Sequence, residues 1–130
     1  MRLRMGLAAV ALAAMAAPAM ADTCNEPVAP VISVVGATAT IQQMRDAIAD
    51  FKIYQKGADD FQDCVDAQIK ALQEAAKNSK DGKPADPSVI SGLLSRSTAL
   101  QAEKEKIGGQ LNVQIVAYKQ AHPAPAKTQN

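Results

Sequence analysis

Residues 38–77, TATIQQMRDAIADFKIYQKGADDFQDCVDAQIKALQEAAK, decide the fold of this chain. Apolar residues recur there at intervals of three and four, which places them on one face of an α-helix. The positions in this stripe are Ile41, Met44, Ile48, Phe51, Ala58, Val65, Ile69, Leu72 and Ala76, with Gln55 and Gln62 completing the pattern. Tyr54, Phe61 and Cys64 widen the stripe, as expected where a helix meets more than one neighbour. The stretch predicts one long amphipathic helix, capped by Thr38 or Thr40.

A second helix is predicted after a turn at residues 78–87, NSKDGKPADP, where Gly82 tolerates a positive φ. Asp86 suits the N-cap and Pro87 the first helical position. The second stripe consists of Ile90, Leu93, Leu100, Ile107, Leu111 and Tyr118, with Ser97, Lys104 and Gln114 between them. We therefore expect an all-α fold in which residues 37–121 form a long antiparallel two-helix hairpin, coiled-coil-like, with helices at about 38–77 and 87–121. Residues 122–130 are polar and proline-containing, and predict a disordered tail.

Residues 1–21 have the pattern of a signal peptide. Basic residues at Arg2 and Arg4 precede an apolar run over 6–16, and Ala19-Met20-Ala21 forms a small-x-small cleavage site. The apolar run is too short to span a bilayer core of about 30 Å. We expect cleavage after Ala21, a periplasmic location, and no stable membrane insertion of the mature chain.

Cys24 and Cys64 are the two cysteines of the chain. In an oxidising compartment such a pair is expected to form one disulfide. In the chain-entropy model, this disulfide should stabilise the folded protein by roughly 4 kcal/mol, because of the long loop that it closes. Redox catalysis usually requires a close C-x-x-C pair, a motif that this sequence does not contain.

Residues 22–36 predict an extended arm, because Pro27 and Pro30 prevent a helix through its first half. Cys64 would lie roughly 39 Å along the first helix from Thr38, while the segment from Cys24 to Thr38 reaches at most about 50 Å. A disulfide therefore requires the arm to run back along this helix, nearly straight. We expect its valines to cover the hairpin groove as a third layer.

Gly57, Gly108 and Gly109 are expected to lie near one another halfway along the hairpin if the turn is centred near Gly82. Glycine inside a helix costs about 1 kcal/mol relative to alanine, so the coincidence favours a close helix crossing, a kink or a hinge. The alternative is that these are three unrelated, tolerated glycines.

Charge and composition argue against several function classes. Without Arg2 and Arg4 the chain carries 12 basic and 13 acidic side chains, a formal net charge of −1, which gives no electrostatic attraction to nucleic acid. The acidic cluster comprises Asp59, Asp60, Asp63 and Asp66. We interpret it as a solvated face within reach of Lys104 and Lys106, because helical carboxylates do not wrap a single ion as a calcium loop does. No catalytic residue, cofactor site or metal site is predicted, and His122 lies at a fraying helix end.

The chain resembles a group of small secreted proteins of Gram-negative bacteria that has no established activity. The resemblance rests on a C-x-x-P motif at Cys24, on FQDCV at residues 61–65, on QAEKEKIG at residues 101–108, and on Tyr118-Lys119. It implies export and a helical architecture, with an aromatic residue three positions before the second cysteine, which is Phe61 here.

Taken together, the sequence favours a non-enzymatic structural or protein-interaction module of the cell envelope. A two-helix rod has a limited core, so a protein partner or self-association is expected to cover the remaining apolar surface. A holdase-like periplasmic chaperone is the main alternative, and a small metal-dependent hydrolase is a remote one.

Overall fold

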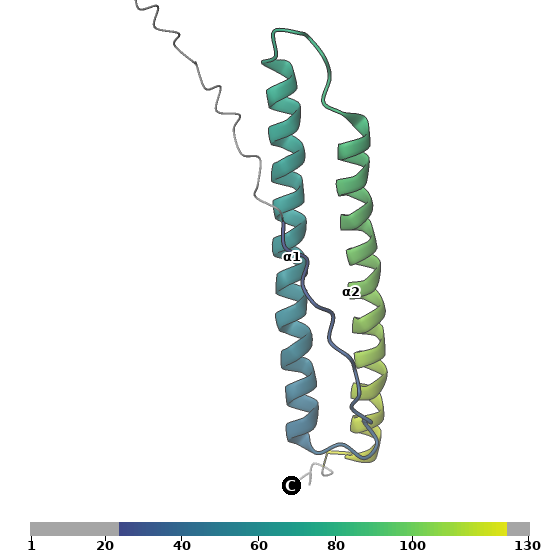
Figure 1. The fold of residues 1–130 in the computed structure, drawn as a ribbon. Helices are drawn as coiled ribbons and strands as arrows, with labels where there is room; N and C mark the ends of the chain where they lie inside the picture. The colour runs from purple at the N-terminus through teal and green to yellow at the C-terminus, as the bar shows by residue number, and fades with distance from the viewer. Residues whose placement is uncertain (1–23, 125–130) are drawn as a thin grey trace, which may run out of the picture.

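The structure is a computed structural model that describes residues 24–124. Helix α1 (Ile41–Lys77) and helix α2 (Pro87–Ala121) pack side by side and antiparallel, which confirms the predicted all-α hairpin (Figure 1). The predicted signal peptide at 1–21 and most of the predicted tail lie outside the described residues. Neither helix is long and apolar enough to cross a membrane.

Local sequence explains where each helix begins. Thr40 caps α1: its hydroxyl accepts a hydrogen bond from the Gln43 backbone N–H at 3.2 Å, while the Gln43 side chain accepts one from the Thr40 backbone N–H at 2.8 Å. Asp86 caps α2 with Pro87 in the first position. Hydrogen bonds from the Ser88 hydroxyl and backbone N–H lower the pKa of the Asp86 carboxyl. Gly82 has a φ of 61° in the connecting turn.

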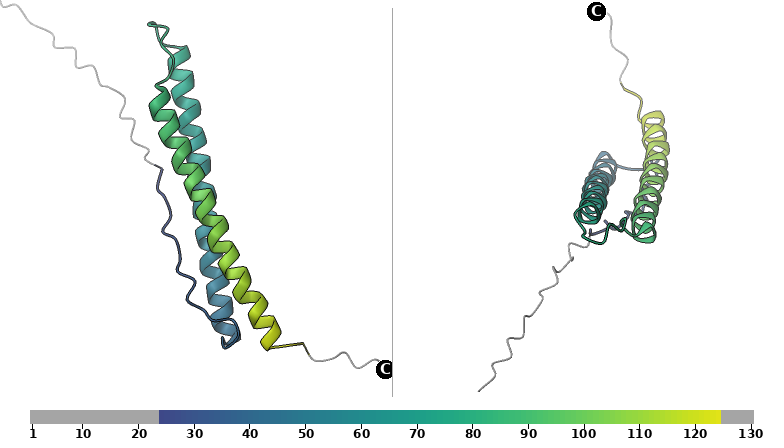
Figure 2. Two further views of the ribbon diagram at one scale, coloured as in Figure 1. Left: turned by 90° about the vertical axis from the view of Figure 1, so that its right-hand side faces the viewer. Right: turned by 90° about the horizontal axis from the view of Figure 1, so that it is seen from above.

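An extended arm precedes α1 and forms a third layer. It starts beside the middle of α1 and descends along the groove between the two helices (Figures 1 and 2). A tight turn at residues 36–38 then leads into α1 at the open end of the hairpin. The arm therefore runs back along α1, as its length and the position of Cys64 predict.

The core lies where all three layers meet. Its buried members are Cys24, Tyr54, Ala58, Phe61, Val65, Leu100 and Ile107. Ala29 and Ile32 of the arm pack against this cluster. Tyr54 and Phe61, predicted to flank the stripe, are 3% and 1% exposed, whereas Ile41 within the predicted stripe is 50% exposed. The difference arises because the arm covers that flank of α1.

Burial is uneven along the hairpin. Among the described residues, the last buried side chain of α1 is Val65 and the first of α2 is Leu100. The part of the hairpin nearest the turn consists of two layers, because the described arm begins at Cys24, level with Cys64. Side chains there, such as Ile69 and Leu93, are only partly buried.

Candidate functional site

The candidate site is the arm and the helix faces that hold it. A disulfide joins Cys24 of the arm to Cys64 of α1, with their Cα atoms 5.7 Å apart, which confirms the predicted pairing. Cys24 is buried and belongs to the core cluster. The disulfide therefore fixes the upper end of the arm at mid-helix.

Arg96 of α2 contacts both the arm, at Glu26, and α1, at Phe61. Its guanidinium lies 5.0 Å from the centre of the Phe61 ring, and its Nη2 atom lies 3.3 Å from the Glu26 carboxylate. The ion pair is half-exposed, so its contribution to stability is small. The buried Phe61 ring is the larger contribution, since it is 1% exposed and belongs to the core cluster.

Tyr54 is a buried phenol beneath the arm. Its hydroxyl donates a hydrogen bond to the Glu103 carboxylate at 3.0 Å. Burial raises the pKa of Tyr54 to about 12, and the hydrogen bond to Glu103 together with the negative charges of Glu103 and Glu26 adds to the shift. The phenol therefore remains protonated near neutral pH and serves to link α1 to α2.

Gly36 anchors the lower end of the arm. Its backbone N–H donates to the Gln114 side chain at 2.9 Å, and a β-carbon at this position would collide with the backbone carbonyl of Gln114. The arm thus lies directly on the backbone of α2. From the sequence, Gly36 is expected only to belong to the extended segment, because nothing in the local sequence reveals which distant helix approaches it.

The space beside the helix glycines is occupied by side chains or is open, so the expected close helix crossing is not found there, and the kink or hinge stays a prediction. The space beside Gly57 is occupied by Pro27 of the arm, 2.9 Å from where a β-carbon would lie. Phe51 occupies the space beside Gly108, and Gly109 faces open space. Both helices continue through these positions. The arm was predicted as a layer, but its contact with Gly57 depends on a register that only the packed structure fixes.

Three of the four arm valines face outward and only Val34 is partly buried, which corrects the expectation that the valines cover the groove. Val28, Val31 and Val35 are 92%, 87% and 60% exposed. Contact with the core comes instead from Ala29 and Ile32. From Val31 to Gly36, exposed residues alternate with less exposed ones, as in an extended strand.

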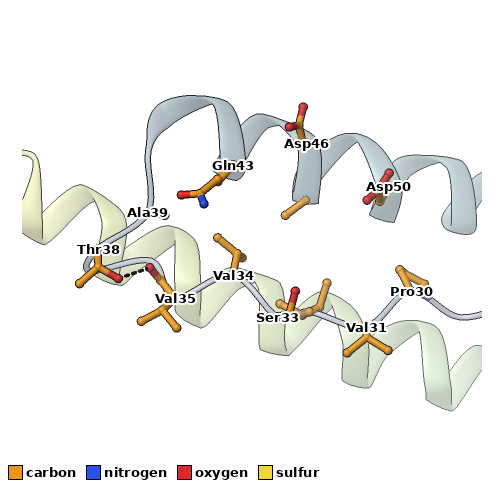
Figure 3. A pocket seen from close by; sticks show the side chains of 12 residues that line it. Pro30, Val31, Ser33, Val34, Val35, Thr38, Ala39, Gln43, Asp46 and Asp50 are labelled. Carbon is orange, nitrogen blue, oxygen red and sulfur yellow. Dashed lines mark hydrogen bonds between the residues drawn. The ribbon is translucent and has the colours of Figure 1, made fainter.

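Figure 3 shows the groove of about 450 Å³ between the arm and α1. Val34 points toward α1, whereas Val31 and Val35 point away from it. The Asp46 and Asp50 carboxylates also line this groove but extend away from the arm. The groove has no convergent set of polar groups.

Two of the four aspartates of the acidic cluster, Asp59 and Asp60, take part in ion pairs. Lys104 of α2 lies 2.7 Å from the Asp59 carboxylate, as the hairpin register predicts, and Lys56 lies 2.6 Å from Asp60. No group of three metal-ligating side chains occurs within residues 24–124. His122 stacks on Tyr118 at the end of α2, with the ring centres 4.3 Å apart.

Comparison of the chain with protein-family models, curated proteins and solved structures found no match.

Proposed function

We propose that this chain is an exported, non-enzymatic protein-interaction module of the cell envelope, and that the outer edge of its arm is the binding surface. The observation that carries this proposal is the exposure of Val28 and Val31, at 92% and 87%, on a segment fixed at both ends. Apolar side chains gathered at a surface are typical of interaction sites.

The arm is suited to recognition because it is held in one conformation. The disulfide fixes its start, Pro27 packs on Gly57, and Gly36 is fixed by Gln114. A segment that is already ordered loses little conformational entropy when a partner binds. Within the described residues, the main chain of residues 25–30 makes no hydrogen bond, so its polar groups are open to a partner. The partner chemistry that fits is an apolar groove that accepts an extended, proline-containing segment.

Export is supported by two independent features. Residues 1–21 have the signal-peptide pattern, and a disulfide fits a protein of an oxidising compartment. Fractionation followed by intact mass measurement tests this part of the proposal. We expect a periplasmic protein that begins at Asp22 and lacks two hydrogens. A cytoplasmic protein that retains residues 1–21 would contradict it.

A role without catalysis is supported by the state of the reactive side chains. Both cysteines are in the disulfide, Tyr54 is a protonated phenol near neutral pH, and His122 stacks on Tyr118. Each of these groups serves a packing or bonding role in the fold.

Photo-crosslinking in the native cell tests the binding surface. A photoreactive phenylalanine at Val31 should give one discrete adduct, and the additional change Val28→Asp should remove it. The same probe at Ala67, which is exposed on α1, is the matched control and should give no adduct. A broad range of adducts at Val31 would favour the holdase-like chaperone instead. Equal labelling at both positions, or none, would contradict the proposal.

A further inference from the structure

A second groove lies on the other side of the arm, between the arm and α2, and we call it the arm–α2 groove. Residues 29–32 of the arm form one wall, and α2 forms the other. Its volume is about 790 Å³, larger than the groove of about 450 Å³ beside α1. The arm crosses from α1 toward α2 as it descends, so the groove follows the half of the hairpin away from the turn (Figure 1). The α2 wall consists of Ala102, Glu103, Lys106, Ile107, Gln110, Val113 and Gln114.

The arm–α2 groove is apolar at its base and on both walls. Ile107 is 6% exposed and belongs to the core, and Ile32 of the arm packs against that core. Val31 of the arm and Val113 of α2 also line the groove, but they are 87% and 62% exposed. A chain that entered the groove would cover both valines at once. The groove therefore extends the apolar surface of the arm onto α2.

Two polar side chains of the α2 wall have partners, and two do not. Glu103 accepts a hydrogen bond from the phenol of α1, and Gln114 accepts one from the main chain of the arm. Lys106 and Gln110 are exposed and form no hydrogen bond or ion pair with any residue of the described chain. They are four residues apart, so they project from one face of α2. The groove thus presents one unpaired positive charge and one unpaired amide, a single helical turn apart.

The arm wall contributes main-chain groups. Among residues 24–124, nothing accepts a hydrogen bond from the N–H groups of Ala29, Val31 and Ile32. Main-chain groups of an extended segment pair well with those of another extended segment, as at the edge of a sheet. From Lys106 to Val113 the α2 wall is roughly 10 Å long, which about three residues of extended chain cover. A short extended segment therefore matches the length and the polar groups of the groove.

We propose that the arm–α2 groove receives an extended segment of the partner, and that this segment carries an acidic side chain close to an apolar one. The inference rests on the proposed function, since the same partner covers the outer edge of the arm. The carboxylate would pair with Lys106, and the apolar side chain would pack between Val31 and Val113. The Gln110 amide can both donate to and accept from the main chain of the segment. A basic segment would be disfavoured, because its charge would meet Lys106.

Photo-crosslinking in the native cell tests whether the partner enters the groove. A photoreactive phenylalanine at Val113 should give the same adduct as the probe at Val31. Val116 is the matched control, because it is 45% exposed on α2 and does not line the groove, and a probe there should give no adduct. An adduct at Val31 without one at Val113 would overturn this inference and leave the proposed function standing. Absence of an adduct at both positions would overturn both.

Charge reversal tests the acidic character of the segment. A library of random linear peptides, selected on the immobilised oxidised protein, supplies the probe. Enriched peptides should combine Asp or Glu with Val, Leu or Ile. Lys106→Glu should weaken the binding of an enriched peptide about tenfold, because an attractive pair of exposed charges becomes a repulsive one.

Lys52→Glu makes the same change of charge at an exposed position of α1 outside the groove, and should leave peptide binding unchanged. Enrichment of basic peptides, or equal binding of the enriched peptide to the wild-type protein and to Lys106→Glu, would overturn the inference. The arm surface is tested separately by the probe at Val31, which requires no knowledge of the charge of the segment.

Discussion

Replacing Gly57 by alanine tests the contact between the arm and α1. Alanine in the interior of a helix is more favourable than glycine by about 1 kcal/mol. Here, however, the new β-carbon would lie 2.9 Å from Cβ and 3.5 Å from Cγ of Pro27. The rigid proline ring cannot rotate away, so the arm must shift, and overpacking of this kind costs about 1–3 kcal/mol. We expect Gly57→Ala to destabilise the protein by about 1 kcal/mol, which is the overpacking cost less the helix gain.

A double-mutant cycle isolates the contact. Pro27→Gly removes both atoms that the new β-carbon meets, so in that background Gly57→Ala should stabilise the protein by about 1 kcal/mol. The two changes should therefore be coupled by about 2 kcal/mol. Gly92→Ala is the matched control, because no atom lies within 4 Å of a β-carbon at that exposed position of α2. It should stabilise the protein by a similar amount in both backgrounds.

The assay is urea unfolding of the oxidised protein, followed by far-ultraviolet circular dichroism. The unfolding free energies of the variants can be compared if the slope of free energy against urea concentration is the same for all of them. If Gly57→Ala stabilises the wild-type protein as much as Gly92→Ala does, the arm does not press on Gly57 and the reasoning is refuted.

Three further predictions concern the ends of the arm and the phenol beneath it. Cys64→Ser should lower the free energy of unfolding by about 4 kcal/mol, and an unchanged thermal midpoint would exclude a stabilising disulfide. Gly36→Ala should lower the free energy of unfolding by about 2 kcal/mol or more and speed amide exchange in the arm. Gln114→Ala should lower it by about 1 kcal/mol, because it removes one hydrogen bond. Equal effects of the two changes would show that the close backbone approach is absent. In Tyr118→Phe, absorbance at alkaline pH reports Tyr54 alone and should give a midpoint of about 12. Because the pKa of Tyr54 is raised in the folded protein, the stability that Tyr54 contributes is complete below pH 10 and is lost as the pH rises toward 12. A titration midpoint near 10 with the helices intact would contradict the buried hydrogen bond.

Much of the fold could be predicted because its signals are local or geometric. The three-four spacing of apolar residues, Asp86 before Pro87, and Gly82 in the turn determine the helices and their connection. The direction of the arm followed from chain length once Cys24 and Cys64 were paired. The proximity of Lys104 to the acidic cluster followed from the hairpin register.

The parts of the site that could not be predicted depend on which surfaces meet across the layers. Gly57 was assigned to a helix crossing, yet it accommodates Pro27, and Gly36 contacts the backbone of α2. Apolar residues occur throughout the arm, so the sequence does not indicate which of them face inward. The outward direction of Val28 and Val31 therefore became visible only with the arm in place.

The sequence by itself determined two helices, a reversing turn and an arm tied to mid-helix, since periodicity, capping and chain length act within a segment or along a known distance. The tertiary structure alone decided which residues of the arm are buried, which glycines admit a neighbour, and that Tyr54 and Phe61 belong to the buried core. These properties depend on the rotation and register of three packed layers, and shifts of a few ångströms there exchange buried side chains for exposed ones.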